Sequence, residues 1–308
     1  MKKLIWLFII LILLVSSAQG EEPISYTYGN WKYTLLEDGT AEIIECLETN
    51  STLRIPSQID GHTVTSLGNY AFTYCIFSTS ISIPDTVTSI KNDAFAFCYS
   101  LTSISIPNSV TSIGDRAFDA CSSLNSISIP DSVTYIGNSA FAFCSSLSSI
   151  TIPDSVTIMG DNPFQHCENL KIINISPDHP VLATIDGVLF CKPEKKLITY
   201  PCASNQPTYA VPQGIICIGN NAFSHCNSLI SVDIPNSVSS IGNDAFSYCE
   251  SLCSINIPNS VSSIGNDAFD GCSSLTSITV ARNSYAAQWC KKQGLSHMYP
   301  DSLDWLKK

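Results

Sequence analysis

The amino-acid sequence predicts a mainly β solenoid in which similar coils stack along one axis, with short helical turns on the convex side. Of the 308 residues only 13% are charged, about half the share in a typical soluble domain. Proline recurs every 23 residues, at Pro84, Pro107, Pro130 and Pro153 and again at Pro212, Pro235 and Pro258. Cysteine keeps the same period, at Cys75, Cys98, Cys121, Cys144 and Cys167 and again at Cys226, Cys249 and Cys272. Such a fixed period is typical of repeats that stack and share one core.

Residues 106–128, which read IPNSVTSIGDRAFDACSSLNSIS, represent one coil. The preceding segment, Leu101–Ile106, alternates apolar and polar residues, so we expect a short strand that ends at Pro107. The segment from Gly114 to Cys121 favours a single helical turn. The apolar positions should face the core; they are Ile106, Val110, Ile113, Ala117, Phe118, Cys121, Leu124 and Ile127. Coils of this kind account for residues 55–176 and 212–280.

Residues 1–20 have the features of a signal peptide. Lys2 and Lys3 precede the apolar run Leu4–Val15, and small residues follow at Ser17–Gly20. The run is too short to span a bilayer. We therefore expect a secreted protein, extracellular or at the cell surface, with no transmembrane segment in the mature chain.

The two ends of the mature chain differ from the repeats. In residues 21–54, the segment Trp31–Ile43 contains Asp38-Gly39, a typical hairpin turn. Residues 281–308 include the segment Ser284–Cys290 and a short tail. We expect a hairpin at the first end.

The repeated unit I-P-x-S-V-x-x-I-G-x-x-A-F-x-x-C-x-S-L, from about Ile55 to Val280, resembles the BspA-like leucine-rich repeats of secreted and surface proteins. Trp31–Ile43 resembles the N-terminal capping hairpin of that family, and Ser284–Cys290 resembles its closing helix. The resemblance therefore implies a capping hairpin in residues 21–54 and a C-terminal cap and tail in residues 281–308. The resemblance implies a leucine-rich-repeat solenoid with an N-terminal β-hairpin cap and a C-terminal helical cap. It also implies adhesion or surface binding, without one ligand common to the family.

The period breaks once inside the repeats. Pro153 and Pro212 are 59 residues apart, which is 36 more than one repeat of 23. We interpret residues 177–211 as an elongated coil with an inserted hairpin, whose strands are Asp186–Phe190 and Lys195–Pro201. The insert is either a structural spacer or a protruding part of a binding surface.

Charge and motifs argue against several functions. Acidic residues outnumber basic ones 26 to 15, which is unsuited to nucleic-acid binding. The chain has no phosphate-binding loop, no glycine-rich dinucleotide turn and no hydrolase motif. His166 and His225 occupy equivalent repeat positions, but the extra residues lie between them, so we interpret both as surface histidines. We expect no enzymatic activity, no cofactor and no metal site.

The 14 cysteines fall into two groups. The eight periodic ones should form an inward column of buried thiols, because parallel side chains give poor disulfide geometry. The others are Cys46, Cys191, Cys202, Cys217, Cys253 and Cys290. Among them we expect one disulfide, between Cys191 and Cys202 across the inserted hairpin.

The exposed side chains of the predicted strands form two rows, since side chains alternate across a strand. One row is Ser80, Ser103, Ser126, Ser149, Ile172, Ser231, Ser254 and Ser277; the other is Ser82, Ser105, Ser128, Thr151, Asn174, Asp233, Asn256 and Thr279. Our candidate binding residues are Ser103, Ser105, Ser126, Ser128, Ser149 and Thr151.

Two interpretations of these rows differ in class. In the first, a monomeric secreted protein binds a protein or glycan on a host or neighbouring cell through the strand face. In the second, the rows have no specific macromolecular partner and belong to a structural or ice-binding solenoid that orders water. Ile172, Asp233 and Asn256 interrupt the rows, which disfavours the second interpretation.

Overall fold

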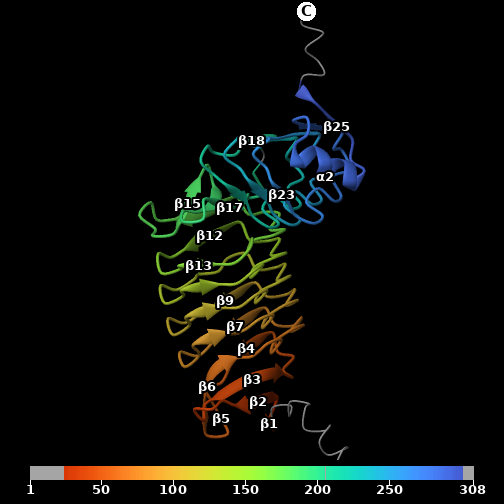
Figure 1. Ribbon diagram of the computed structural model, residues 1–308. Coiled ribbons are helices and arrows are strands. Elements are labelled where there is room, and N and C mark those ends of the chain that lie inside the picture. Colours follow the sequence, from red (N-terminus) through yellow and green to blue (C-terminus); the bar gives the residue numbers. More distant parts are fainter. Residues whose placement is uncertain (1–23, 205, 301–308) are drawn as a thin grey trace, which may run out of the picture.

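The computed structural model describes residues 24–204 and 206–300. The expected signal peptide, residues 1–20, and residues 301–308 of the tail lie outside this range. The chain forms a solenoid whose coils stack from a hairpin cap at the N-terminal end to a helix at the C-terminal end (Figure 1). The predicted leucine-rich-repeat solenoid is confirmed.

The predicted strand of each coil lies on one side of the stack, which we call the hydroxyl face. Its strands are β4 (Thr52–Arg54), β7 (Ser80–Ser82), β9 (Ser103–Ser105), β12 (Ser149–Ile152), β14 (Ile172–Ile175), β18 (Thr208–Ala210), β20 (Ser231–Asp233), β22 (Ser254–Ile257), β24 (Ser277–Val280) and β25 (His297–Met298). Neighbouring strands are parallel. Within the repeat blocks residues 23 positions apart are in register, as Ser80 and Ser103 are, whereas the outermost strands pair Thr52 with Ser80 and Ile278 with His297.

A second strand in each coil was not predicted from the sequence. These strands are β6 (His62–Leu67), β8 (Ser89–Ile90), β10 (Ser112–Ile113), β11 (Tyr135–Ile136), β13 (Ile158–Met159), β19 (Cys217–Ile218), β21 (Ser240–Ile241) and β23 (Ser263–Ile264). Most have two residues, which is too short for an alternating pattern to be recognised. They pair in parallel with the equivalent strands of adjacent coils.

The third side of each coil is a series of tight turns where the sequence predicts a helical turn. Between Gly114 and Cys121, alternate backbone N–H groups donate within the turn and to the next coil. Asp119 donates to the carbonyl of Arg116 at 3.0 Å, whereas Phe118 donates to Ala140 at 2.8 Å. A helix would direct every N–H group along its own chain, so the hydrogen bonds between coils exclude it.

The core consists of columns of identical side chains. All eight apolar positions predicted for residues 106–128 are buried. The phenylalanine rings stack from coil to coil, with centroid distances of 4.9 Å for Phe72–Phe95, 5.3 Å for Phe95–Phe118 and 5.1 Å for Phe246–Phe269. This stacking provides apolar burial and offset ring contacts in every coil.

A tryptophan closes the phenylalanine column at each end. The N-terminal cap contains β1 (Ser25–Tyr28), β2 (Trp31–Leu35) and β3 (Ala41–Cys46), and Trp31 contacts Phe72 edge-on at 6.2 Å. The C-terminal cap is α2 (Tyr285–Gln293), whose Trp289 contacts Phe269 edge-on at 5.8 Å. Ser284 caps α2 by accepting a hydrogen bond from the Ala287 N–H, and Gly294 ends it in the left-handed conformation.

One short strand lies outside these two sets. β5 (Gln58–Ile59) pairs antiparallel with β6 around a turn at Asp60 and Gly61.

The inserted region is a three-stranded antiparallel meander. Its strands are β15 (Leu182–Ile185), β16 (Val188–Cys191) and β17 (Lys196–Thr199). β15 was not predicted from the sequence, and the predicted strand Asp186–Phe190 is wrong at Asp186 and Gly187. Both residues have positive φ angles, of 52° and 81°, and form the turn between β15 and β16.

The insert interrupts the hydroxyl face. β14 pairs with β12, β18 pairs with β20, and β14 and β18 lie in different sheets. β17 continues into the second repeat block by pairing with β19. On the turn side the two blocks are joined by polar contacts, among them Lys196 Nζ to Asp161 at 2.7 Å and Asn162 Nδ2 to the Asn221 carbonyl at 2.6 Å.

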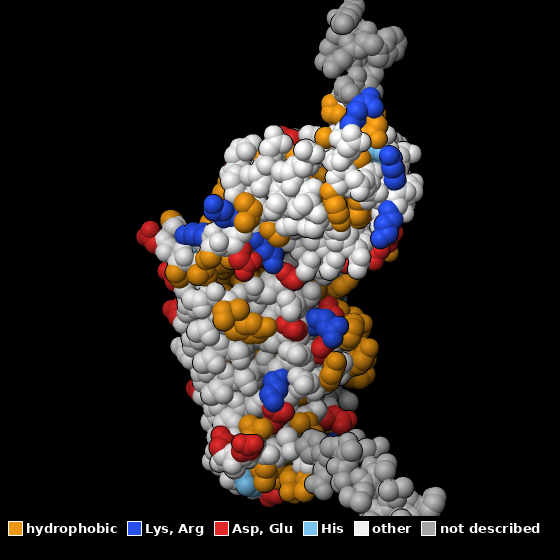
Figure 2. All heavy atoms as spheres, viewed as in Figure 1, with side chains coloured by type: hydrophobic (Ala, Val, Ile, Leu, Met, Phe, Trp, Pro, Cys, Tyr) orange, Lys and Arg blue, Asp and Glu red, His pale blue; other side chains and the backbone are white. Residues whose placement is uncertain are grey.

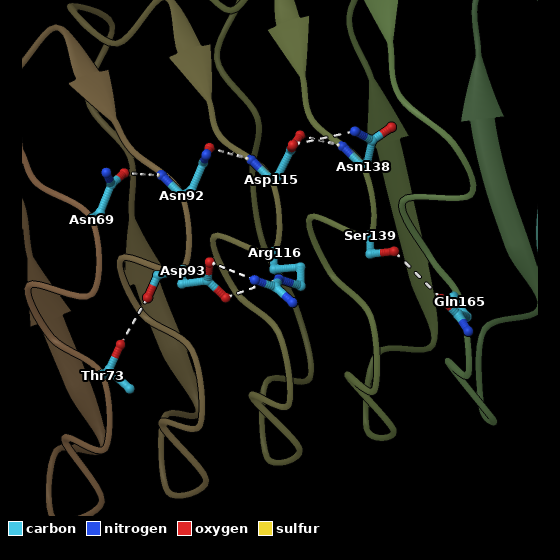
Figure 3. A network of polar contacts seen from close by, with 9 residues as sticks. All are labelled: Asn69, Thr73, Asn92, Asp93, Asp115, Arg116, Asn138, Ser139 and Gln165. Atoms are coloured by element: carbon cyan, nitrogen blue, oxygen red, sulfur yellow. Dashed lines mark hydrogen bonds and ion pairs between the residues drawn. The ribbon is translucent and has the colours of Figure 1, made fainter.

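A ladder of asparagine and aspartate side chains runs beside the second strands (Figure 3). Each accepts a hydrogen bond from the equivalent backbone N–H of the next coil: Asn69 from Asn92 at 3.1 Å, Asn92 from Asp115 at 2.9 Å, and Asp115 from Asn138 at 2.7 Å. The residue before each ladder position in most coils is glycine, and a Cβ at Gly137 would lie 2.5 Å from the Asp115 nitrogen. Glycine therefore permits the close approach that the ladder needs.

We expect Gly137→Ala to lower the free energy of unfolding by about 1–3 kcal/mol, because the added methyl group forces adjacent coils apart. Urea unfolding followed by circular dichroism measures the change. The exposed Ser126→Ala is the control and should stay within about 0.5 kcal/mol of the wild type. Equal stability of Gly137→Ala and wild type would contradict the close-approach argument.

Candidate functional site

The six candidate binding residues lie on the hydroxyl face. Ser103, Ser105, Ser126, Ser128, Ser149 and Thr151 are all exposed, while the isoleucines between them, such as Ile104 and Ile150, are buried. Ser105 pairs with Ser82 on one side and forms an isolated bridge with Ser128 on the other. The structure therefore brings these hydroxyl groups together in regular rows.

The rows change character at β14. Ser149 pairs with Ile172, which is 53% exposed, and Thr151 pairs with Asn174. Beyond the insert the equivalent positions include Asp233 and Asn256 in β20 and β22. The uniform hydroxyl surface thus belongs to the first repeat block.

Most cysteines of the column are free and buried. The thiol groups of Cys98, Cys121, Cys144, Cys167, Cys249 and Cys272 each donate to a phenylalanine carbonyl of the preceding coil, at 3.0–3.2 Å. Burial raises the pKa of Cys167 to about 12. Each of these thiols is a small core group that donates a hydrogen bond to one backbone carbonyl of the preceding coil.

The predicted Cys191–Cys202 disulfide is wrong. Cys191 is free, and Cys202 is bonded to Cys226, with the two Cα atoms 4.5 Å apart. Cys202 follows Tyr200, which stacks on Phe223 at 5.2 Å and so occupies the phenylalanine column of the elongated coil. Only two residues separate Leu197 from Tyr200, against four between Ile113 and Phe118. Cys202 also follows Tyr200 by two positions, whereas Cys121 follows Phe118 by three, so Cys202 departs from the spacing of the regular column.

We expect twelve of the fourteen cysteines to be alkylated by iodoacetamide in the denatured, unreduced protein, because twelve are free. Native protein at pH 8 should be labelled first at the exposed Cys253, since burial keeps the column thiols protonated. Mass spectrometry after digestion counts the labels. Fewer than twelve labels in the denatured protein would contradict the thiol column.

The turn side carries a row of aromatic side chains that the sequence analysis did not recognise. On the face shown in Figure 2, hydrophobic side chains gather along one edge of the stack. Equivalent positions of successive coils hold Tyr74, Phe97, Ala120, Phe143, His166, His225, Tyr248 and Gly271. All have positive φ angles. The spacing of 23 between these residues was a signal that could have revealed the row.

The rings of this row are in contact wherever neighbouring coils both carry one; most pairs are stacked, and Phe143 and His166 are tilted by 39°. Centroid distances are 4.9 Å for Tyr74–Phe97, 4.5 Å for Phe143–His166 and 4.9 Å for His225–Tyr248. His166 and His225 stack at 4.0 Å, although the insert separates them in the sequence. Burial lowers the pKa of His225. Within residues 24–204 and 206–300, no three potential metal ligands gather at one point.

A groove of about 540 Å³ lies in this row at Ala120, where the aromatic side chain is missing. We call it the Ala120 groove. It is lined by Phe97, Tyr99, Asp119, Ala120, Ser122, Phe143, Ser145, His166 and Glu168. The lining combines aromatic rings with the carboxylates of Asp119 and Glu168.

Asp119 occupies a position that holds the buried Ala96 and Ala142 in the adjacent coils. Its Oδ1 atom is buried and has no hydrogen-bond partner. Burial raises the pKa of Asp119 to about 6, and the nearby Asp93 acts in the same direction, while Arg116 opposes them. Arg116 itself forms a two-pronged ion pair with Asp93, at 3.0 and 3.1 Å (Figure 3).

The comparisons with known proteins agree with this architecture. The model of the BspA type leucine rich repeat region matches residues 65–192 and 200–290 in six copies, which is more than half of the chain. This chain belongs to the BspA-type leucine-rich-repeat family. No curated protein matches it.

Solved structures of bacterial leucine-rich-repeat proteins are similar to this BspA-type protein. A leucine rich cell surface protein from Faecalibacterium prausnitzii is 28% identical with a TM-score of 0.57, over 91% of this chain and 96% of that one. A protein from Eubacterium ventriosum is 25% identical with a TM-score of 0.62, over 84% and 73%. The pneumococcal vaccine antigen PcpA, 23% identical with a TM-score of 0.69 over 86% and 83%, shares the fold.

None of the helices in the described part of the chain has the length and apolar character that a membrane crossing requires.

We expect Asp119→Asn to stabilise the protein at pH 8 but not at pH 4. The folded-state pKa of about 6 exceeds the ordinary value of 3.8, so the wild type loses stability as the pH rises from about 4 to 6 and the carboxylate ionises. The asparagine variant has no such loss. Urea midpoints of both proteins at pH 4 and pH 8 measure the difference, with the exposed Asp131→Asn as control. A difference that is the same at both pH values would contradict the raised pKa.

Proposed function

We propose that this BspA-type protein acts outside the cell, secreted or held at the cell surface, and binds a protein or glycan of a host or neighbouring cell. The hydroxyl face of the first repeat block is the proposed binding surface. The observation that carries the proposal is the exposed, in-register arrangement of the six candidate hydroxyl groups. The family, the similarity to a bacterial cell surface protein and the signal-peptide features of residues 1–20 support it.

Hydroxyl groups on a regular sheet suit this role because each can donate and accept hydrogen bonds. Extended surfaces of stacked repeats are where solenoid proteins usually contact partners. The surface carries no charge at these six positions, so recognition would depend on shape and hydrogen bonding. We propose a monomer with no catalytic role and no cofactor.

The water-ordering alternative has less support. An ice-binding surface requires long, uninterrupted rows of equivalent groups. Here the rows meet the exposed Ile172, and the sheet itself is interrupted between β14 and β18. A macromolecular partner, which contacts a limited area, does not require that continuity.

We expect the triple variant Ser103→Glu, Ser126→Glu and Ser149→Glu to lose binding about tenfold or more, because three carboxylates in one row would remain desolvated and unpaired at the interface. Binding to immobilised extracellular-matrix proteins and to a glycan array provides the measurement.

The matched control places the same charges on another side of the stack, at the exposed Thr111, Thr134 and Thr157. This triple variant should bind as the wild type does. Equal loss in both variants would show that net charge, not the hydroxyl face, governs binding. Retained binding in the serine triple variant would move the site elsewhere.

A further inference from the structure

The aromatic row of the turn side has its open gap at Ala120. Two positions of the row lack an aromatic ring, Ala120 and Gly271. At Gly271 the ring of Tyr248 approaches so closely that a Cβ would lie 2.6 Å from it. At Ala120 the space between the flanking rings remains open as the groove of about 540 Å³.

The width of the gap suits one flat group. Phe97 and Phe143 belong to coils on either side of the Ala120 coil, so they stand about two strand spacings, or roughly 9.6 Å, apart. Adjacent rings elsewhere in the row are 4.0–4.9 Å apart. A planar group inserted above Ala120 would therefore contact both ring faces at ordinary stacking distance.

The carboxylates that line the groove favour a hydrogen-bond donor with positive charge. Asp119 lines the groove, and its buried Oδ1 atom accepts no hydrogen bond. Arg116, the basic residue near it, is paired with Asp93. Glu168, whose Oε1 lies 3.3 Å from His166 Nδ1, adds a second carboxylate to the lining. The formal charge of the whole chain, −11, also favours a cation.

We propose that the Ala120 groove binds the guanidinium group of an arginine side chain from a partner protein. A guanidinium group is flat, stacks on aromatic faces and carries several N–H donors for a carboxylate. A neutral aromatic ring would stack but would leave Asp119 without a donor. A lysine ammonium group would pair with Asp119 but would not fill a flat slot. This site lies on the turn side and is independent of the proposed function of the hydroxyl face.

The test is a titration of the ¹⁵N-labelled protein with the capped peptide Gly-Arg-Gly, followed by two-dimensional NMR. The matched probe replaces arginine by citrulline, which has the same shape without the charge. We expect the arginine peptide to shift the amide signals of Phe97, Ala120 and Phe143. It should bind about tenfold more tightly than the citrulline peptide, because its hydrogen bonds to Asp119 are charge-assisted.

Two variants separate the contributions of charge and shape. Asp119→Asn should reduce the affinity of the arginine peptide to that of the citrulline peptide. Ala120→Phe should abolish binding of both, because the new ring fills the gap. Phenylalanine already occupies this left-handed position at Phe97 and Phe143, with φ angles of 60° and 56°, so the fold should accept it. Asp131→Asn, with the same charge change at an exposed site, should bind as the wild type does.

The proposal is overturned if the citrulline peptide binds as tightly as the arginine peptide, or if Ala120→Phe still binds. Absence of shifts at the groove would overturn it as well. A neutral sugar, methyl glucoside, serves as a third probe. If it shifts the groove signals more strongly than the arginine peptide and Asp119→Asn leaves its binding unchanged, the groove binds glycans and the arginine assignment is wrong.

Discussion

The structure depends on the backbone hydrogen bonds between consecutive coils. On all three sides of the stack, N–H groups of one coil donate to carbonyl groups of its neighbour, and this holds adjacent coils one strand spacing apart. Glycine at positions such as Gly137 and left-handed residues in the turns follow from that spacing. So does the column of stacked phenylalanine rings, whose exposed ends are covered by Trp31 and Trp289.

The same register organises the surface. Equivalent residues of successive coils lie side by side, so each exposed repeat position becomes a row: hydroxyl groups on one side, aromatic rings on another. A residue that differs in type from the others in its row therefore changes the surface at that one position. Ala120 opens a groove between rings, and Asp119 puts a carboxylate where neighbours have alanine. In a stack of near-identical coils, such departures are where specificity for a partner can arise.

The elongated coil divides the stack into two blocks and affects the hydroxyl face and the turn side differently. Its meander supplies β17 to the second block while interrupting the hydroxyl face between β14 and β18. On the turn side the blocks remain in contact, and the aromatic row continues across the junction through His166 and His225. The elongated coil also contains Cys202, which forms the disulfide with Cys226.

The 23-residue period determined the solenoid, the buried positions and the exposed hydroxyl rows, because side-chain direction in a repeating coil follows from sequence position. The caps lie outside this period, and the resemblance of the flanking segments to the family indicated them. The second strands were too short to show an alternating pattern. The conformation of the turns depends on hydrogen bonds to the next coil, which cannot be predicted from the sequence of one turn. Only the tertiary structure paired Cys202 with Cys226 and brought Phe97, Asp119 and Phe143 around one groove. These contacts join residues of different coils. Their geometry depends on the spacing of residues in the irregular coil and on how adjacent turns stack.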